Sequence, residues 1–530
     1  MNTALAVLIC LVMTCSLCAA RTLRVPVEFE TIQGALNALL ANDTVLVDTG
    51  LYVEELTAPA LSFVVIGNIS ADTSDHARPI IDPAGLANPG GRGCLSLSSG
   101  NVRIENFVFR NGTAMHPHWT GDVGGIHVLG SMNLSLTNCR FDSVYYGIFA
   151  HGDIASIVNL EWCEFVHAMG RCVFAATIIA EHCSFHTDTV DWAQLTFGDY
   201  SSIVNCSFSG NFRGGNVLLC SGKHVTITGC RFSNFVFAPA SSSVVLRVGA
   251  SEVSNNVFSD YQKGQSVLQV SPPCDAEPNV ISGNRFENLT TPESHAFLTA
   301  QCLGFGAADN PDSCATIQVY DNVFINCSST IGPVGISTAM NCNIAYNRFI
   351  GMHVPNRPVV SIDDIPHLFR ENIFQGNGIA VAPGSIHGMV HAEWNYWGDA
   401  TGPYHPVLNP TALGDTVADS VDFDPWFSDT LFWSSAEEET DLLSSTWQLR
   451  AIYPNPFNSE FRIELDGMTG ADFEVRLFDL LGREVALLHS GRTLRGALNF
   501  AAPANLAAGI YFISAHDRFY SETKKVLYLK

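Results

Sequence analysis

The sequence predicts an all-β protein: a right-handed parallel β-helix solenoid with an N-terminal capping helix, followed by a small immunoglobulin-like β-sandwich. Three observations lead to this prediction. The chain of 530 residues is too long for one compact core. Glycine (43 residues) and phenylalanine (33) are abundant, which suits strands and tight turns. A short motif ending in phenylalanine recurs through the middle of the chain, and no period between copies has room for an ordinary helix.

The first twenty residues, "MNTALAVLICLVMTCSLCAA", are predicted to be a signal peptide, residues 1–20. A continuous apolar run ends in small residues, and Cys18 and Ala20 fit a signal-peptidase cut before Arg21. No Lys or Arg precedes the apolar run, so a membrane anchor is the alternative. No later apolar run is long enough to span a bilayer, and we expect no transmembrane segment in the mature chain.

The chain is acidic, with 51 Asp and Glu residues against 27 Lys and Arg residues and a formal net charge of -24. Such a surface repels the phosphates of nucleic acids and of anionic membranes. We therefore expect no nucleic-acid partner and a soluble, secreted protein.

Residues 21–428 are predicted to form the β-helix with its end caps. The motif, for example "NCRF" or "GNRF", recurs at a spacing of mostly 20 to 28 residues, and each period holds two or three short apolar strands. Strands at this spacing without hairpin signals favour stacked coils about 4.8 Å apart. With an earlier copy at Phe109, the phenylalanines then form one buried column: Phe141, Phe165, Phe185, Phe208, Phe232, Phe258, Phe286, Phe324, Phe349 and Phe374.

A second column lies two residues before each phenylalanine and is predicted to be structural. Buried thiols behave as small hydrophobes, and stacked Asn amides bond one another and the turn backbone. Disulfides between rungs are an alternative with poor geometry, because parallel side chains point the same way. A straight column also does not surround a tetrahedral zinc ion. The column consists of a thiol ladder and then an amide ladder: Cys139, Cys163, Cys183, Cys206, Cys230, Asn256, Asn284, Asn322, Asn347 and Asn372.

Other cysteines are better candidates for disulfides. Three of the sixteen cysteines lie in the leader, and the thirteen that remain cannot all pair. Cys302 and Cys314, with Cys274 nearby, lie outside the column and would pair in an oxidising compartment.

A capping helix is predicted at the N-terminal end of the solenoid. Ile32, Leu36 and Leu39 fall on one helical face, and Thr31 is a candidate N-cap. The stretch that follows, "DTVLVDTGLYVE", resembles the first strand pair of secreted pectate-lyase-like β-helix proteins. It also resembles the first motif of pectin methylesterases, which occurs in many β-helix proteins without enzymatic activity. The resemblance rests on Asp43, Thr44, Val45, Val47, Gly50, Tyr52 and Glu54.

At the other end, "NYWGDATGPYHP" and "GDTVADSVDFDPWF" resemble the closing segment of bacterial β-helix surface proteins. We expect a cap in which Trp and Phe cover the last coil. A carbohydrate-binding platform at Trp394 and Trp397 is the alternative. The resemblance rests on Asn395, Trp397, Gly398, Gly402, Pro403, Gly414, Asp415, Pro425 and Trp426.

After an acidic linker at residues 429–448, residues 449–530 alternate like a small β-sandwich. The motifs "YPNPFN", "LFDLLGREV" and "AAGIYFI" with the end "TKKVLYLK" resemble the type A C-terminal sorting domain of the type IX secretion system. The resemblance implies that this secretion machinery is a partner and that the protein is secreted or held on the outer-membrane surface of a Gram-negative bacterium. An ordinary immunoglobulin-like end module is the alternative. The matching residues are Tyr453, Pro454, Asn455, Pro456, Phe457, Asn458, Gly482, Gly509, Tyr511, Lys524 and Lys525.

No known catalytic set can be assembled, so the catalytic residues and metal ligands stay unknown. A pectate-type lyase needs carboxylates around calcium with a basic residue, and a glycoside hydrolase needs close carboxylates. Aligning the repeats gives an outward column of His127, Leu219, Arg247 and Gln269, which contains no carboxylate. The pair Asp363–Asp364 has no partner motif.

Two histidine-rich clusters favour solvated loops over a metal or sugar site, which is the alternative. The first consists of His116, His118, Trp119 and Asp122, and the second of His151, His167, His182, His186, Asp188 and Asp191.

These patterns predict a secreted or cell-surface β-helix protein with a binding or structural role, with glycans as the expected ligand. The alternative is a polysaccharide lyase or hydrolase that acts on an acidic polysaccharide. No cofactor is evident, and calcium is the one that the sequence leaves open. A carboxylate cluster facing a cleft would favour the enzyme, and a flat face of Asn, Ser and Thr would favour binding.

Overall fold

The computed structural model describes most of the chain, and all structural statements below concern these parts. The described residues are 20–70, 77–86, 93–112, 124–150, 155–190, 193–213, 215–220, 222–237, 244–249, 251–262, 267–270, 279–291, 298–300, 317–329, 335–338, 342–352, 356–362, 368–384, 388–431, 448–466, 472–479, 483–492, 497–502, 506–516 and 521–529.

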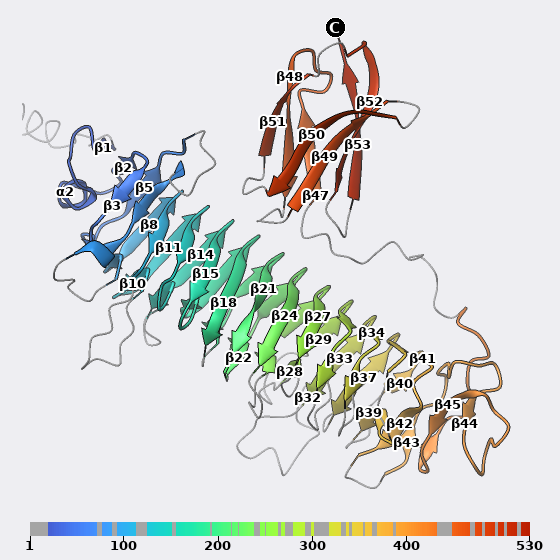
Figure 1. The fold of residues 1–530 in the computed structure, drawn as a ribbon. Helices are drawn as coiled ribbons and strands as arrows, with labels where there is room; N and C mark the ends of the chain where they lie inside the picture. The colour runs from blue at the N-terminus through green and yellow to red at the C-terminus, as the bar shows by residue number, and fades with distance from the viewer. Residues whose placement is uncertain are drawn as a thin grey trace, which may run out of the picture.

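Three long parallel sheets build the N-terminal four-fifths of the described chain (Figure 1). Sheet A contains β1 (Thr22–Val25), β2 (Thr44–Val47), β5 (Phe63–Gly67), β8 (Gly100–Glu105), β11 (Met132–Thr137), β14 (Ile157–Glu161), β17 (Thr177–Glu181), β20 (Ser202–Val204), β23 (Val225–Thr228), β26 (Ser251–Ser254), β29 (Val280–Ser282), β33 (Ile317–Tyr320), β37 (Cys342–Ala345) and β40 (Leu368–Arg370).

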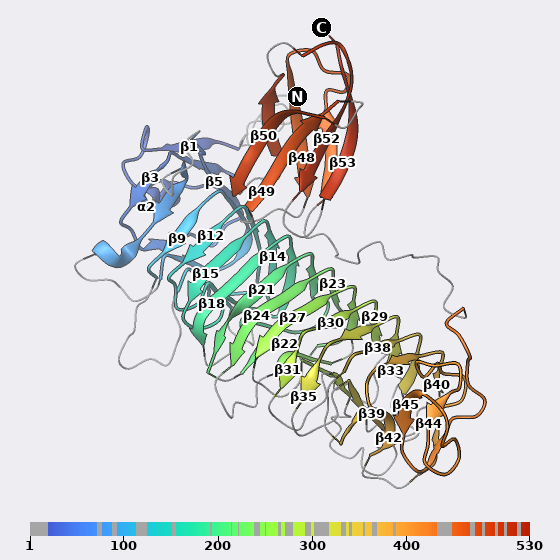
Figure 2. The ribbon, with the colours of Figure 1, turned by 45° about the vertical axis from the view of Figure 1, so that its right-hand side comes forward.

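Sheet B contains β3 (Gly50–Tyr52), β6 (Pro79–Ile81), β9 (Val108–Arg110), β12 (Arg140–Asp142), β15 (Glu164–Ala168), β18 (Ser184–Val190), β21 (Ser207–Phe212), β24 (Arg231–Phe237), β27 (Val257–Gln262), β30 (Arg285–Glu287), β34 (Val323–Ile325), β38 (Arg348–Ile350) and β41 (Ile373–Gln375), with β31 (Thr290–Thr291) and β35 (Ser328–Ser329) beside it. Figure 2 shows these strands stacked in chain order.

Sheet C contains β4 (Leu56–Thr57), β7 (Leu95–Leu97), β10 (Ile126–Val128), β13 (Ile148–Ala150), β16 (Val173–Phe174), β19 (Leu195–Phe197), β22 (Asn216–Cys220), β25 (Val244–Val248), β28 (Leu268–Val270), β32 (Leu298–Ala300), β36 (Ile336–Thr338), β39 (Pro358–Ile362), β42 (Ile379–Pro383), β45 (Gly414–Val417) and β44 (Pro403–Tyr404). Each coil of the solenoid contributes one strand to each sheet, so neighbours in a sheet are a full coil apart in the chain. This is a right-handed parallel β-helix.

The recurring phenylalanines stack inside this solenoid as one continuous column. Consecutive ring centroids from Phe109 to Phe374 lie 4.5–5.0 Å apart and nearly parallel. The last ring stacks on the indole of Trp397 at 5.1 Å. Because Trp397 is fully buried, it is the final rung of the column and not an exposed platform.

The adjacent Cys and Asn column is also fully buried. In the amide half, the backbone N–H of Asn284 donates to Asn322 Oδ1 at 3.0 Å, and Asn284 Nδ2 donates to the same oxygen at 2.9 Å. In the thiol half, the N–H of Cys183 donates to the sulfur of Cys206 at 3.4 Å. Burial raises the pKa of the Cys183 thiol well above its ordinary value. None of the ten described cysteines forms a disulfide within the described residues, and Cys274, Cys302 and Cys314 lie outside these residues.

The turn from sheet A to sheet B repeats a left-handed backbone conformation just before each rung. Gly, Asn and Asp tolerate this conformation, whereas larger residues are strained in it. The residues in this column have φ of 51–64°: Asn106, Asn138, Trp162, His182, Asn205, Gly229, Asn255, Gly283, Asp321, Tyr346, Glu371 and Trp394.

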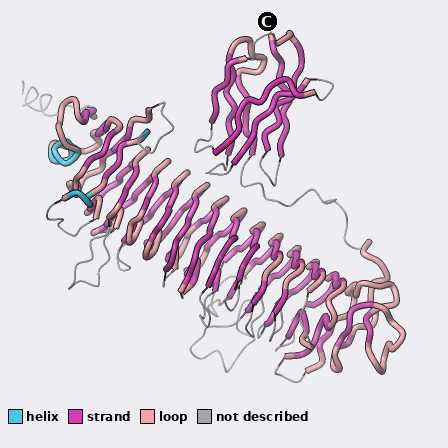
Figure 3. Tube along the Cα trace, viewed as in Figure 1, coloured by secondary structure: helices cyan, strands magenta, loops and turns pink. Residues whose placement is uncertain are grey.

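Helix α2 (Ile32–Asn37) closes the N-terminal end, and Figure 3 shows it in cyan beside the first coils. Ile32 and Leu36 are buried against the solenoid core. Thr31 Oγ1 accepts a hydrogen bond from the N–H of Gly34 at 3.0 Å. The carboxylate of Glu54 accepts two more from the first helical turn, each at 2.9 Å. A short 3₁₀ helix, η2 (Pro83–Gly85), follows β6.

A buried carboxylate, Asp43, joins Arg21, which precedes β1, to Leu40, which follows this helix. It accepts hydrogen bonds from the backbone N–H of Arg21 at 2.8 Å, from the Arg21 guanidinium, and from the N–H of Leu40 at 2.9 Å. The Arg21 guanidinium, opposed in part by burial, lowers the pKa of Asp43 to about 2.

The C-terminal end of the solenoid is closed by a short parallel pair, β43 (Val390–His391) and β46 (Val421–Asp422), and by the segment around β44 and β45. Asn395 extends the amide ladder by one rung and accepts from the N–H of Asn372 at 2.9 Å. Asp415 receives the N–H and the side-chain amide of Asn377. Trp394 is about half exposed and lies 5.5 Å from the ring of Phe427.

The last described part of the chain is a separate two-sheet unit with its own core. A three-stranded sheet with the order β47-β48-β51 faces a four-stranded sheet with the order β50-β49-β52-β53, and neighbouring strands in both sheets are antiparallel. No helix among the described residues is long and apolar enough to cross a membrane. The strands are β47 (Gln448–Tyr453), β48 (Glu460–Asp466), β49 (Asp472–Phe478), β50 (Glu484–Arg492), β51 (Ala497–Ala501), β52 (Gly509–His516) and β53 (Ser521–Tyr528).

Candidate functional site

An open groove of about 530 Å³ runs along the outer face of sheet A, where β8, β11, β14 and β17 begin. It is shallow-walled because the turns that lead from sheet C into these strands carry small residues. The lining residues are Gly100, Asn101, Ser131, Met132, Asn133, Ala155, Ser156, Ile157, Ala176 and Thr177. None of these side chains is charged, so the groove offers amides, hydroxyls and methyl groups.

One outward column crosses the groove in strand register. Asn101 pairs with Asn133, Asn133 with Ile157, and Ile157 with Thr177. The amide of Asn133 donates to Asn101 Oδ1 at 3.2 Å. Ile157 is 38% exposed and adds an apolar side chain to the lining of the groove. Amide pairs beside an exposed apolar side chain suit a ligand that has both hydroxyl groups and C–H faces.

Two aromatic side chains continue this column beyond the groove. Ser202 on β20 pairs with Ile179 on β17. Tyr200 lies two residues before Ser202, just as Thr177 lies two residues before Ile179, so Tyr200 and Thr177 belong to the same column. The ring of Tyr200 stacks on that of His224 at 5.0 Å and 15°. Both residues have φ of 57°, and Tyr200 is 68% exposed. A solvent-facing aromatic ring held in a strained backbone conformation is a candidate binding surface.

A second constellation lies where the same strands of sheet A end. Glu161 and Glu181 face outward on neighbouring coils and are paired in register. Next to them, the indole of Trp162 stacks on the imidazole of His182 at 4.5 Å. His182 Nε2 lies 3.3 Å from a carboxylate oxygen of Glu181. Most glycoside hydrolases use a pair of carboxyl groups that flank the bond they cleave.

The column predicted from the aligned repeats lies on the outer face of sheet C. His127, Leu219, Arg247 and Gln269 share one register, which Phe149 and Phe174 also join. Arg247 Nε donates to Gln269 Oε1 at 3.1 Å. The guanidinium of Arg171 lies 4.9 Å above the ring of Phe174. No described residue of this column is a carboxylate, so its chemistry is aromatic and basic.

Three residues of the second histidine cluster meet on sheet B. His167 Nδ1 lies 2.7 Å from one oxygen of Asp188, and His186 Nε2 lies 3.5 Å from the other oxygen. His186 Nδ1 also contacts Ser209 Oγ at 2.9 Å. All three side chains are about half exposed, which fits a hydrogen-bonded surface network. The remaining predicted residues lie outside the described parts: His116, His118, Trp119, Asp122, His151, Asp191, Asp363, Asp364 and Gly482.

The "YPNPFN" segment, at the beginning of the terminal unit, hydrogen-bonds to and packs against the last strand, β53. Asn455 Nδ2 donates to the carbonyl of Lys525 at 3.1 Å, and Asn455 Oδ1 accepts from the N–H of Leu527 at 2.9 Å. The ring of Phe457 is buried and lies 5.1 Å from that of Tyr528. These contacts explain why the motif at one end of the domain occurs together with "TKKVLYLK" at the other.

Residues 451–528 match the family model of the secretion system C-terminal sorting domain. This protein is exported by the type IX secretion system. It is therefore secreted or displayed on the cell surface. The sorting-domain residues Tyr511, Lys524 and Lys525 lie on β52 and β53, and the hydroxyl of Tyr511 donates to the carbonyl of Ala507 at 2.8 Å.

The solenoid of this type IX substrate matches the family model of the right handed beta helix region over residues 124–271. A mannuronic acid specific polysaccharide family 6 lyase from human gut microbiota is similar in structure, with a TM-score of 0.32 at 10% identity over 76% of this chain and 92% of that one. PfbA, a surface adhesin of Streptococcus pneumoniae, has a TM-score of 0.30 at 13% identity, over 62% and 87%.

The tailspike of E. coli bacteriophage HK620 has a TM-score of 0.28 at 12% identity, over 93% and 88%. Similarities this low carry no argument about ligand or activity. No curated protein matches the sequence.

Sequence reasoning found the outward column of sheet C in this type IX substrate but missed the groove and the Tyr200–His224 stack on sheet A. The available signal was local: an aromatic residue at a turn position that Asn or Gly ordinarily fills. To find the Tyr200–His224 stack from the sequence, the repeats would also have to be aligned strand by strand for sheet A, and not for sheet C alone.

Proposed function

We propose that this exported β-helix protein binds glycan chains along the outer face of sheet A. The observation that carries the proposal is the groove, whose described lining offers Asn, Ser and Thr side chains and no charged group. A glycan presents hydroxyl groups that amides can bond and C–H faces that pack on Ile157 and on the Tyr200 ring. The coil repeat would match a ligand that is itself a repeating polymer.

The test is retention of the exported protein in affinity gels that contain neutral or acidic polysaccharides, with and without calcium. Tyr200→Asn removes the exposed ring and suits the left-handed backbone. Tyr346→Asn is the matched control, because Tyr346 has nearly the same φ (56°) on a distant coil. We expect Tyr200→Asn to reduce retention by roughly 10-fold, as loss of a central aromatic anchor does, and Tyr346→Asn to leave it unchanged. Equal retention of both variants would contradict the proposal.

Hydrolysis of the bound polysaccharide is a second candidate, because Glu161 and Glu181 are neighbours on the same face. The same incubations are therefore assayed for reducing and unsaturated ends. Release of ends that Glu161→Gln and Glu181→Gln each abolish would assign an enzyme. Retention without release would leave a surface binding module.

A further inference from the structure

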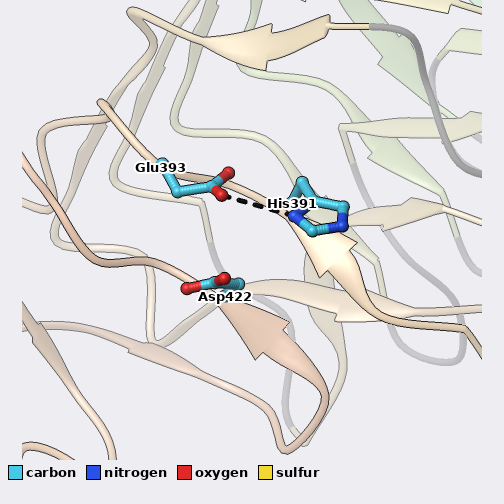
Figure 4. A group of neighbouring side chains, drawn as sticks. All are labelled: His391, Glu393 and Asp422. Carbon is cyan, nitrogen blue, oxygen red and sulfur yellow. Dashed lines mark hydrogen bonds and ion pairs between the residues drawn. The ribbon is translucent and has the colours of Figure 1, made fainter.

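The cap of the solenoid brings one imidazole and two carboxylates together (Figure 4). His391 on β43 is paired in register with Asp422 on β46. Glu393 follows His391 by two residues, and Figure 4 shows its carboxylate beside the imidazole and above that of Asp422. One donor atom from each side chain lies within 4.8 Å of the other two.

No Lys or Arg side chain in the described part of the chain neutralises these two carboxylates. Within the described residues, neither Glu393 nor Asp422 forms an ion pair with Lys or Arg, and the one contact is between His391 Nδ1 and Glu393 Oε1 at 3.3 Å. A charge-assisted hydrogen bond would be about 2.7–2.9 Å long. The imidazole and the carboxylate are therefore close without being tightly bonded to each other.

The 3.3 Å separation of the His391 nitrogen and the Glu393 oxygen also fits the geometry of a metal site. Zinc bonds to His nitrogen and carboxylate oxygen are about 2.0–2.2 Å, and the edge of the corresponding tetrahedron is about 3.3–3.6 Å. The Asp422 oxygen lies within 4.8 Å of both other donors, which exceeds this edge by at most about 1.5 Å. Calcium would instead need six to eight oxygen ligands, which this set does not supply.

The backbone around the three side chains is already fixed. The N–H of Val390 donates to the carbonyl of Ser420 at 2.9 Å, that of Ala392 to Asp422 at 2.7 Å, and that of Trp394 to Pro425 at 2.6 Å. Val390, Ala392 and Val421 are buried between these positions. A ligand set on a rigid, paired frame loses little conformational entropy when an ion binds.

We propose that His391, Glu393 and Asp422 bind a divalent cation of the zinc class, with water as the fourth ligand. The ion would link β43, which continues the last coil, to β46, which closes the cap. This site is independent of the groove on sheet A and of the glycan-binding proposal.

The experiment titrates Zn²⁺ into the full exported protein, prepared without a histidine tag and stripped with a chelator. Glu393→Gln and His391→Ala each remove a direct ligand, and His224→Asn removes a surface imidazole elsewhere while suiting its left-handed backbone. Loss of a direct ligand should cost at least the ~10-fold in affinity that loss of an outer-shell partner costs. We expect both site variants to lose one equivalent of tightly bound Zn²⁺ and the control to lose none.

Two further readouts separate metal binding from a folding defect. Co²⁺ bound at the site should give visible d–d absorption that both site variants lose, although all variants keep the far-ultraviolet circular dichroism of the wild type. Zn²⁺ should also raise the thermal unfolding midpoint of the wild type and of His224→Asn only. Equal Zn²⁺ stoichiometry and affinity in wild type and Glu393→Gln would overturn the proposal, as would displacement of Zn²⁺ by equimolar Ca²⁺.

Discussion

Asp43 is the residue on which the N-terminal closure depends most clearly. Its carboxylate is 2% exposed and meets the Arg21 backbone, the Arg21 guanidinium and the N–H of Leu40. A buried carboxylate with this many donors is strongly favoured in its charged form. One side chain therefore holds the first strand, the end of the capping helix and the second strand together.

Acid should weaken this closure. Because the folded protein lowers the pKa of Asp43 from 3.8 to about 2, its contribution is fully present above about pH 4 and is lost as the pH falls towards 2. The contribution is at most about 2 kcal/mol, since Arg21 is 44% exposed. We expect Asp43→Asn to lower the thermal unfolding midpoint at pH 7, and the two proteins to converge near pH 2. A constant difference across this pH range would contradict the assignment.

Removal of the predicted leader before Arg21 should strengthen the same closure. The cut would convert the Arg21 backbone N–H, 2.8 Å from Asp43 Oδ1, into a charged α-ammonium group. The ionised Asp43 carboxylate already makes this bond charge-assisted, and a charged donor would add a Coulomb attraction to it. A chain that begins at Arg21 should therefore melt at a higher temperature than one with an extra residue before it. The difference should disappear in the Asp43→Asn background, and its persistence there would exclude this explanation.

At the scale of the coil, the inward ladder and the outward surface obey different constraints. The side chain of each ladder residue accepts the backbone N–H of the ladder residue one coil earlier, so Asn or Cys recurs at this position. Outward side chains do not need to accept a hydrogen bond from the neighbouring coil. One outward column of sheet A therefore contains three different residue types, at Asn133, Ile157 and Thr177. Because outward positions tolerate different residue types, they can carry residues that contact a ligand.

Breaking one amide rung should destabilise the solenoid. Asn322→Ala removes the oxygen that accepts both the N–H and the side-chain amide of Asn284. The buried N–H then loses this acceptor, whereas Asn284 Nδ2 keeps its bond to the carbonyl of Val253 at 2.8 Å. At about 1–3 kcal/mol for the N–H and about 1 kcal/mol for the lost side-chain bond, we expect a loss of roughly 2–4 kcal/mol in the free energy of unfolding. Denaturant unfolding measures this loss, and Asn211→Ala, at an exposed position of β21, is the control. A loss no larger than that of the control would show that the ladder is not cooperative.

The same difference explains what could be predicted from the sequence. The phenylalanine repeat and the Cys and Asn positions are visible because buried columns repeat in sequence as well as in space. Tyr200 and His224 do not belong to a repeated motif, and their stacking depends on a register that loops of unequal length conceal. His391, Glu393 and Asp422 come together because β43 pairs with β46, about thirty residues later in the chain. No sequence pattern predicts this pairing.

At the scale of the whole molecule, the described chain has two hydrophobic cores that share no residue. The solenoid carries the groove, and the sorting domain carries the export motif around Asn455 and Phe457. We therefore expect the solenoid to fold without the sorting domain, because the export motif and the groove belong to different cores.

Deletion of residues 449–530 should stop export without unfolding the solenoid. We expect the truncated protein to accumulate in the periplasm as a β-rich, protease-resistant species, detected by cell fractionation. Asn455→Ala should reduce export in part, because it removes two bonds between "YPNPFN" and β53. Normal export of the truncated chain would contradict the assigned role of the tail.

The polarity of the amide ladder has a consequence for how the chain assembles after translocation. The N–H of Asn284, of Asn322 and of Asn347 each donates to the rung that comes later in the chain, at 3.0–3.1 Å. A solenoid that winds from its N-terminal end therefore presents an unmet N–H donor at each amide rung until the next coil arrives. The Asn395 rung, with Trp397 at the end of the ring column, completes this series at the cap.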